Sequence, residues 1–195
     1  LTIITSTSGD TGGAVAAAYH GMKGVWVVIL YPAGKISDLQ AKQMDTLKEN
    51  IYVIRVKTDF DGCADLTSRL QKDTELRYMN MNSSNSVNIG RLLPQIAYYF
   101  HTYSRIAENG EEVYVSVPSG NFGNAVAGLF AMRMGLPIKL IIAVNENDVF
   151  YRFYKTGIYT PAEKTHSSPS NSMNVNKPSN MRRLFQLYGG KLVDG

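Results

Sequence analysis

The sequence has little cysteine, histidine and tryptophan. Cys63 is the single cysteine among 195 residues, accompanied by three histidines and one tryptophan. A lone cysteine excludes an intrachain disulfide and a cysteine-rich metal site. The histidines, His20, His101 and His166, have no carboxylate or cysteine at ligand spacing, so we expect no metal site. We expect a reducing compartment, with Cys63 packed as a small core residue.

Long apolar runs and dense basic patches are also missing. No run approaches the roughly 20 apolar residues that a membrane helix needs, and no basic-then-apolar leader is present. The net charge is +4 and the pI about 9.1, but the densest basic cluster is only Arg182 and Arg183. A nucleic-acid surface requires a basic stripe or patch. We therefore expect a cytoplasmic protein that binds neither nucleic acid nor membrane.

The first residues, "LTIITS", are typical of the inside of a strand, and position 1 is not methionine. We expect the chain to be a piece of a longer protein. Its sheet would then have unpaired strand edges, which allow self-association.

Segments typical of strands alternate with segments typical of helices. The run "GVWVVILYP" is continuously apolar and β-branched, as in a strand buried on both faces. This alternation predicts an α/β fold with parallel strands and helices on both faces, and ligands bind such sheets at the carboxyl ends of the strands. The expected strands are 2–5, 24–32, 51–56, 112–117 and 139–144, and a cut-off strand is expected in 189–195. The expected helices are 12–19, 37–48, 61–72, 88–106, 125–134 and 181–188, and 159–180 is expected to be a surface loop.

Two glycine-rich turns each follow an expected strand and precede a helix. They are "SGDTGG", Ser8 to Gly13, and "SGNFGN", Ser119 to Asn124. Free N–H groups and the helix dipole at such a place attract anions. The alternative is a plain connection in which Asp10 and Thr11 cap the first helix. Neither turn ends in Gly-Lys-Ser/Thr, so the sequence does not support a nucleotide P-loop.

A third cluster, "NMNSSNSVNIGR", runs from Asn80 to Arg91 and is rich in amides and hydroxyls. Arginine can bind a phosphate or carboxylate through two hydrogen bonds, and Asn and Ser can complete such a site. The alternative is an elaborate helix cap with Arg91 on the solvent face.

In that order, "TSGDTG", "NSVNIGR" and "SVPSGNFGN" resemble the pyridoxal-phosphate enzymes of the tryptophan synthase β fold, also called fold type II, and among them the threonine synthase family. The likeness runs from about Thr5 to Ser172. It implies a central fragment with three-layer αβα parallel sheets, truncated at both ends. It also implies a small domain over residues 1–106 and part of a larger cofactor domain over 107–195.

The resemblance implies pyridoxal 5'-phosphate as cofactor. Asp10 stands where many relatives carry an asparagine that faces the cofactor ring. The second turn looks like the loop whose backbone amides bind the cofactor phosphate, which assigns that role to Gly120, Asn121, Phe122, Gly123 and Asn124.

The resemblance also implies a phosphorylated small-molecule substrate, O-phosphohomoserine. Ser8 and Thr11 would receive the carboxylate or phosphate of the amino acid. Asn85, Ser86 and Arg91 match positions that bind the substrate phosphate, and a dianionic leaving group needs such charge-assisted donors.

The implied activity is that of a carbon–oxygen lyase acting on phosphates, which converts O-phosphohomoserine and water to threonine and phosphate. The family's covalent cofactor lysine lies upstream of the "SGDTG" turn, whereas none of the residues before Ser8 here is a lysine. We therefore expect the chain by itself to be inactive. Two alternatives remain: a piece of a related threonine or serine dehydratase, and a non-catalytic phosphate-binding domain.

Overall fold

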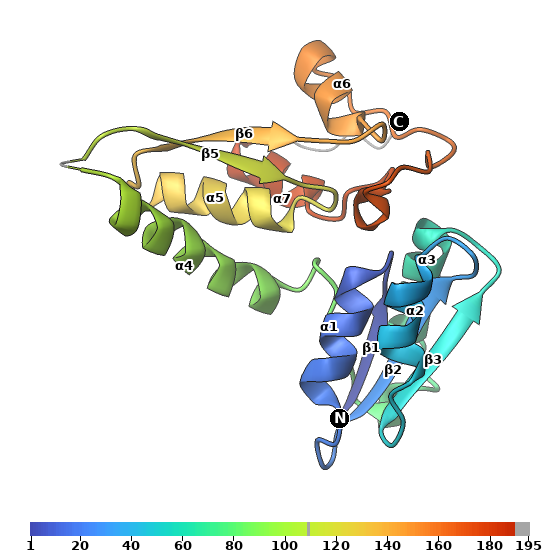
Figure 1. Ribbon diagram of the computed structural model, residues 1–195. Coiled ribbons are helices and arrows are strands. Elements are labelled where there is room, and N and C mark those ends of the chain that lie inside the picture. The colour runs from blue at the N-terminus through green and yellow to red at the C-terminus, as the bar shows by residue number, and fades with distance from the viewer. Residues whose placement is uncertain (109, 190–195) are drawn as a thin grey trace. The chain divides into compact units, whose positions relative to one another are not determined.

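A computed structural model describes residues 1–108 and 110–189 (Figure 1). The chain forms two compact units. The first unit comprises Leu1–Asn85 and Lys164–Val175, and the second comprises Ser86–Glu163 and the residues from Asn176 onward. These units divide after Asn85, whereas the sequence suggested a domain boundary after residue 106. Of the strand expected in 189–195, residues 190–195 lie outside the described residues.

The first unit is built on a four-stranded sheet in the order β3-β2-β1-β4. All neighbouring strands are parallel, with Ile3 of β1 opposite Val27 of β2. The two central strands, β1 and β2, are the most buried, as expected for strands covered on both faces. The strands are β1 (Thr2–Ser6), β2 (Trp26–Pro32), β3 (Ile51–Val56) and β4 (Met81–Ser83).

Helices cover both faces of this sheet. Because successive strand side chains point to opposite faces, Ile3 and Ile4 enter different core clusters. Ile3 packs with residues of α1 (Asp10–Tyr19) and α2 (Asp38–Asp45), and Ile4 packs with Cys63 of α3 (Phe60–Lys72). The first unit is therefore a three-layer α/β/α sandwich, as its sequence predicts.

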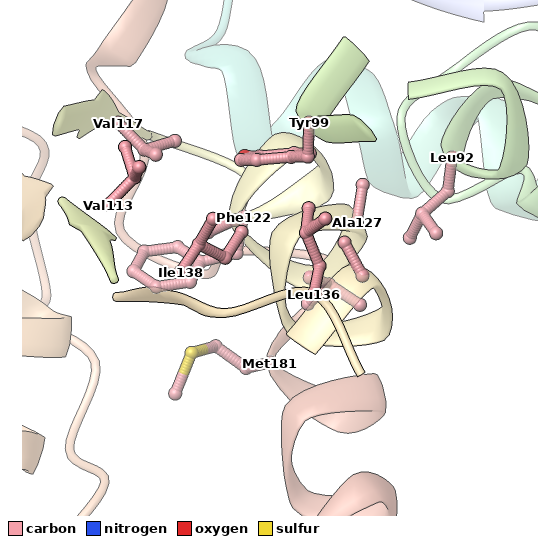
Figure 2. Packing of buried hydrophobic residues seen from close by; sticks show 12 residues of the cluster. Leu92, Tyr99, Val113, Val117, Phe122, Ala127, Leu136, Ile138 and Met181 are labelled. Carbon is pink, nitrogen blue, oxygen red and sulfur yellow. The ribbon is translucent and has the colours of Figure 1, made fainter. Parts of the chain in front are cut away.

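The second unit contains a parallel pair, β5 (Val113–Pro118) and β6 (Ile138–Ala143). Its helices are α4 (Ile89–Ile106), α5 (Gly123–Arg133), α6 (Val149–Thr156) and α7 (Met181–Leu187). One cluster joins them, in which Tyr99, Phe122 and Met181 pack with strand residues such as Val117 and Ile138 (Figure 2). Gly128 allows the close approach of α5, since a Cβ there would lie 2.8 Å from Leu140 Cδ1.

Several expectations need correction. Helix α1 begins at Asp10 with Gly9 as its N-cap, so Asp10 and Thr11 lie in the first turn instead of capping it. Strand β4 and helix α6 were missed, as were short 3₁₀ helices at Arg77–Met79 and Asn171–Met173. The expected surface loop 159–180 is buried in part. No helix within 1–108 or 110–189 is long and apolar enough to cross a membrane.

Candidate functional site

The second glycine-rich turn connects β5 to α5 and is held by a buried ring. Phe122, the N-cap of α5, has a left-handed backbone with φ 64°, a conformation that is costly for a non-glycine residue. Its side chain is 2% exposed, and its ring centroid lies 4.4 Å from that of Phe150. Figure 2 shows Phe122 among the core residues of this unit. Burial of the ring therefore stabilises the strained turn.

The backbone N–H groups of this turn have the chemistry of an anion site. In the part of the chain that the structure describes, the N–H groups from Gly120 to Asn124 donate to no protein acceptor. They stand at the start of an 11-residue helix, whose dipole adds positive potential there. Consecutive unpaired donors of this kind match the needs of a phosphate group.

The side chain of Asn124 shapes the turn from inside. Its Oδ1 accepts hydrogen bonds from Ser119 Oγ (2.6 Å) and the Ala125 N–H (2.9 Å), and its Nδ2 donates to the Pro118 carbonyl (2.9 Å). The Tyr99 hydroxyl donates to the Asn124 carbonyl at 2.6 Å. Burial raises the pKa of Tyr99 to about 12, so this donor keeps its proton at neutral pH. Asn124 is therefore a brace for the turn, and only its backbone N–H is left for a ligand.

Asn180 connects this turn to the segment that carries Ser86. It is fully buried, and its Nδ2 donates to the carbonyls of Ser86 (3.1 Å) and Asn121 (3.0 Å). Its Oδ1 accepts from Arg183, which also donates to the Val87 carbonyl. A Cβ on Gly123 would lie 3.7 Å from Ser86 Cβ. Ser86 therefore lies beside the turn, whereas its binding of a substrate phosphate stays a prediction.

Arg91 lies in the first turn of α4, and the side chain of Asn88 caps this helix. Asn88 Oδ1 accepts from the Gly90 N–H at 2.8 Å. Arg91 is half-buried, and this burial lowers the pKa of its guanidinium, which stays cationic at neutral pH. The helix cap of the alternative interpretation is present in Asn88, whereas Arg91 is half-buried and does not lie on a fully exposed face. A cation partly withdrawn from water binds anions more strongly than an exposed one.

In the first unit, the side chain of Thr7 binds backbone N–H groups of the Thr7–Gly12 turn. Thr7 Oγ1 accepts from the N–H groups of Gly9 (3.0 Å) and Gly12 (2.9 Å). Gly9 has φ 140°, and a Cβ there would lie 2.4 Å from Gln40 Nε2. A Cβ on Gly12 would lie 2.2 Å from Met44 Sδ. Both glycines are therefore required by close approach to α2.

The segment Lys164–Val175 contacts this turn. Ser8 Oγ donates to the Ser172 carbonyl at 3.0 Å, and Gln40 Nε2 donates to both Asp10 Oδ1 (2.7 Å) and Ser172 Oγ (3.1 Å). Asp10 is exposed and Thr11 half-buried. The hydroxyl and carboxylate that the resemblance assigns to the substrate and cofactor are thus already oriented by protein contacts.

Asn85 braces the end of β1. Its Oδ1 accepts from Thr5 Oγ1, the Ser6 N–H and Ser83 Oγ at 3.0–3.2 Å. Its Nδ2 donates to the Ser6 carbonyl (2.6 Å) and to Ser6 Oγ (3.3 Å). Both amide hydrogens are therefore used inside the first unit. This geometry indicates that Asn85 positions the strand end, whereas direct binding of a substrate phosphate stays a prediction.

A cavity of about 170 Å³ lies at the carboxyl edge of the four-stranded sheet. Its lining includes Ser8, Lys35 and Asp59 from the loops that follow β1, β2 and β3, and His166 from the Lys164–Val175 segment. This is the edge at which parallel sheets bind ligands. Within the described ranges there is no group of His, Cys, Asp and Glu side chains that could hold a metal ion.

The expected site residues fall in both units. Ser8, Asp10, Thr11 and Asn85 lie in the first unit, and Ser86, Arg91 and the Gly120–Asn124 turn lie in the second. That they form one site stays a prediction.

Sequence reasoning missed five residues that hold these groups: Gln40, Ser172, Ser179, Asn180 and Arg183. For Ser172, Ser179 and Asn180, the richness of 167–180 in Asn and Ser was the available signal, because such composition can indicate a polar network as well as a loop. Gln40 and Arg183 lie outside this stretch.

Comparisons with known proteins identify the family of the chain. Residues 1–195 match the family described as "Pyridoxal-phosphate dependent enzyme". The chain is 47% identical over 197 residues to the threonine synthase of Buchnera aphidicola subsp. Acyrthosiphon pisum, and 48% identical over 191 residues to that of Haemophilus influenzae. It covers 100% and 96% of its own length in these matches, but only 46% and 45% of the relatives.

Solved structures give the same result. The chain resembles the crystal structure of threonine synthase from Escherichia coli with a TM-score of 0.89 and 44% identity, over 98% of this chain and 46% of that one. It resembles the pyridoxal-phosphate-bound threonine synthase from Brucella melitensis with a TM-score of 0.81 and 36% identity, over 96% and 41%. The expected α/β class and its fold type II relationship are confirmed. The chain spans less than half the length of these relatives, and it belongs to the family of pyridoxal-phosphate dependent enzymes.

Proposed function

We propose that the full-length protein carrying this chain is a threonine synthase, a lyase that converts O-phosphohomoserine and water to threonine and phosphate. The relatives named threonine synthase at 47–48% identity support this reaction. The observation that carries the proposal is the row of unpaired N–H donors at Gly120–Asn124, with Ser86 beside it. This arrangement suits a cofactor and a substrate that both carry phosphate.

The Gly120–Asn124 turn fits the phosphate of pyridoxal 5'-phosphate. Its donors are backbone groups at a helix N-terminus, and Asn124 holds them in place without using them. Donors fixed in this way lose little conformational entropy on binding. When bound, the cofactor serves as an electron sink that stabilises carbanions next to the substrate nitrogen. Asp10 is proposed to face the cofactor ring.

The substrate phosphate would be held by Ser86 and Arg91, with Asn85 fixing the segment that leads into Ser86. Arg91 supplies a partly desolvated cation for a leaving group that departs as a dianion. Ser8 and Thr11 would orient the amino acid end of the substrate. Together these groups bind and orient the substrate and stabilise the departing phosphate.

Every lysine in the 195 residues follows the Thr7–Gly12 turn in sequence, the first being Lys23. The lysine that binds the cofactor covalently is proposed to lie outside these residues. The 195 residues alone are therefore expected to form no threonine, whereas the full-length protein does so. Borohydride reduction with pyridoxal phosphate followed by peptide mapping tests this, since selective labelling of one lysine in the 195 residues contradicts it.

The experiment that tests the function uses the full-length protein and two assays. Release of phosphate and threonine from O-phosphohomoserine is expected. A dehydratase would instead form a 2-oxo acid from threonine or serine without needing phosphate. A protein that binds phosphate but turns over neither substrate would be the non-catalytic alternative, and either result would contradict the proposal.

Arg91→Ala tests the proposed substrate-phosphate site more specifically than the two assays. Loss of a hydrogen-bonded cation costs about 1.5–3 kcal/mol, so kcat/KM for O-phosphohomoserine should fall about 10- to 100-fold. Arg105→Ala is the matched control, because Arg105 is an exposed arginine in the last turn of the same helix. Equal, small effects of the two changes would remove Arg91 from the substrate site.

A further inference from the structure

Gln40 makes an unusual number of side-chain contacts for a residue on a short surface helix. It is the third residue of α2 and forms a capping box with Ser37. Its Oε1 also accepts from Asn171 Nδ2 at 2.6 Å, and its Nε2 donates to Asp10 Oδ1 and Ser172 Oγ. The acceptor and both hydrogens of the amide are therefore used, and they connect three separate parts of the first unit.

These contacts lie around the Thr7–Gly12 turn. A Cβ on Gly9 would lie 2.4–2.7 Å from the amide atoms of Gln40, so the amide is packed directly on the backbone of the turn. On the other side, Ser8 Oγ donates to the Ser172 carbonyl, and Asn171 Nδ2 lies 3.5 Å from the Ser8 carbonyl. The turn is thus enclosed between α2 and the Lys164–Val175 segment, with Gln40 touching both.

We propose that Gln40 is a positioning residue that fixes the Thr7–Gly12 turn to the Lys164–Val175 segment and thereby sets how Ser8 and Asp10 present their side chains. Gln40 does this without touching substrate, because its hydrogen-bonding groups are all directed to Asp10, Ser37, Asn171 and Ser172. The effect of Gln40 on substrate binding rests on the proposed function. The attachment of the turn to the Lys164–Val175 segment by Gln40 does not depend on that function.

The Ser172 carbonyl and a substrate anion would compete for the same hydroxyl hydrogen of Ser8. The single hydroxyl hydrogen of Ser8 is donated to the Ser172 carbonyl. Ser8 can donate to a substrate anion only if this bond is exchanged. Gln40 holds Ser172 through its hydroxyl, so it keeps the segment in place while Ser8 changes partner. Without its contacts to Gln40, the segment would be held less firmly when the Ser8 bond is exchanged.

Hydrogen exchange in the full-length protein tests the structural part. Gln40→Met keeps the side-chain length and removes every hydrogen bond of the side chain, while the backbone N–H can still donate to Ser37 Oγ. We expect amide exchange in peptides covering 164–175 to become about tenfold faster, because the segment loses two hydrogen bonds. Gln43→Met is the matched control on the same helix, since Gln43 is exposed and makes no side-chain hydrogen bond to a described residue. Equal exchange in the two variants overturns the proposal.

A reciprocal change tests the specific Asp10 contact. Gln40→Glu places a second carboxylate beside that of Asp10, and the repulsion should speed exchange in residues 8–12. Adding Asp10→Asn lets the introduced amide donate to the introduced carboxylate, so exchange should return to within about twofold of the wild type. Ser172 and Asn171 can still donate to the carboxylate in the double variant. A general packing role for Gln40 predicts no such rescue, and its absence contradicts the proposal.

Kinetics separate this inference from the proposed function. In a full-length protein that makes threonine, Gln40→Met should raise the KM for O-phosphohomoserine about tenfold while kcat changes less. An unchanged KM overturns the positioning role.

A wild-type protein that makes no threonine contradicts the proposed function, whereas the exchange results still decide whether Gln40 fixes the turn. If Gln40→Met does not fold, Ser172→Ala removes the same contact from the other side and should also speed exchange in 164–175.

Discussion

The two glycine-rich turns have similar sequences and different chemistry. In the first unit, Thr7 binds the N–H groups of Gly9 and Gly12, and Asp10 places a carboxylate in the first turn of α1. In the second unit, the N–H groups of Gly120–Asn124 have no acceptor among the described residues, and the first turn of α5 contains no acidic residue. The first turn therefore presents side chains, and the second presents backbone donors. A Gly-rich strand-to-helix motif does not by itself determine which kind of site results.

The largest expected effect comes from making the second turn resemble the first. Asn124→Asp keeps the oxygen that accepts from Ser119 and Ala125 but puts a negative charge among the backbone donors. We expect the Kd for pyridoxal 5'-phosphate in the full-length protein to rise about 10- to 100-fold, because a carboxylate beside a bound phosphate costs roughly 1–3 kcal/mol at a partly buried site.

The melting temperature should fall modestly in this variant, because Asn124 Nδ2 no longer donates to the Pro118 carbonyl, while a carboxylate at a helix N-terminus offsets part of that loss. Unchanged cofactor affinity would show that the turn does not bind the phosphate. Titration of the cofactor by absorbance provides the measurement, with Asn82→Asp as the control, an Asn-to-Asp change at an exposed position of strand β4 in the first unit.

Glycines of the first turn should respond differently to one added methyl group. Gly12→Ala places its Cβ 2.2 Å from Met44 Sδ and 2.6 Å from Thr7 Cγ2, so overpacking should lower the free energy of unfolding by about 1–3 kcal/mol. Gly13→Ala meets the side chain of exposed Gln43, whose flexible Oε1 lies 3.1 Å away and whose Cβ lies at an ordinary contact distance of 3.4 Å. This change should stabilise α1 by about 0.5–1 kcal/mol. Urea denaturation of the two variants should give opposite signs, and a shared sign would contradict the packing of α1 on α2.

The smallest expected effect is a loss of folding stability at alkaline pH, which occurs over different pH ranges in the two units. Burial raises the pKa of Cys63 from 9.0 to about 11 in the first unit and that of Tyr99 from 10.0 to about 12 in the second. Because each folded pKa is the higher one, the stabilisation is complete below the ordinary pKa and is lost as pH rises through the folded value. Stability should fall between pH 9 and 11 through Cys63 and between pH 10 and 12 through Tyr99.

Cys63→Ala and Tyr99→Phe should each remove only their own part of this alkaline loss. Tyr99→Phe should also cost about 1 kcal/mol at neutral pH, because the Asn124 carbonyl loses its donor. Identical pH profiles for wild type and Tyr99→Phe would contradict a buried, protonated Tyr99. Thermal denaturation at a series of pH values checks both variants.

The sequence predicted elements where a long pattern supports them. The apolar run of β2 and the helical spacing in α4 were sufficient, because burial on two faces and a stripe on one face each leave a clear period. Strand β4 has three residues with no apolar run, and it pairs with β1 through a partner some eighty positions away in sequence. A pattern of local sequence cannot show such a pairing.

The candidate site shows the same limit. The glycine-rich turn at Gly120–Asn124 was predictable as an anion site, but its glycines alone did not show that its N–H groups stay free, because Thr7 binds those of Gly9 and Gly12 in the other turn. The role of Asn180 was not predictable, because its side chain donates to the carbonyls of Ser86 and Asn121, and these come close to it only in the folded unit. Asn85 was assigned to the substrate from its motif, whereas its amide hydrogens are both donated to Ser6.

The central claim is that the backbone of Gly120–Asn124 holds the cofactor phosphate. Glycine-selective amide NMR of the full-length protein tests it most directly, with pyridoxal 5'-phosphate compared against pyridoxal, which lacks the phosphate. We expect the amide protons of Gly120 and Gly123 to move downfield with the phosphorylated cofactor and not with pyridoxal, while Gly110 stays unchanged. Shifts that are equal for the two compounds, or absent from both glycines, would contradict it.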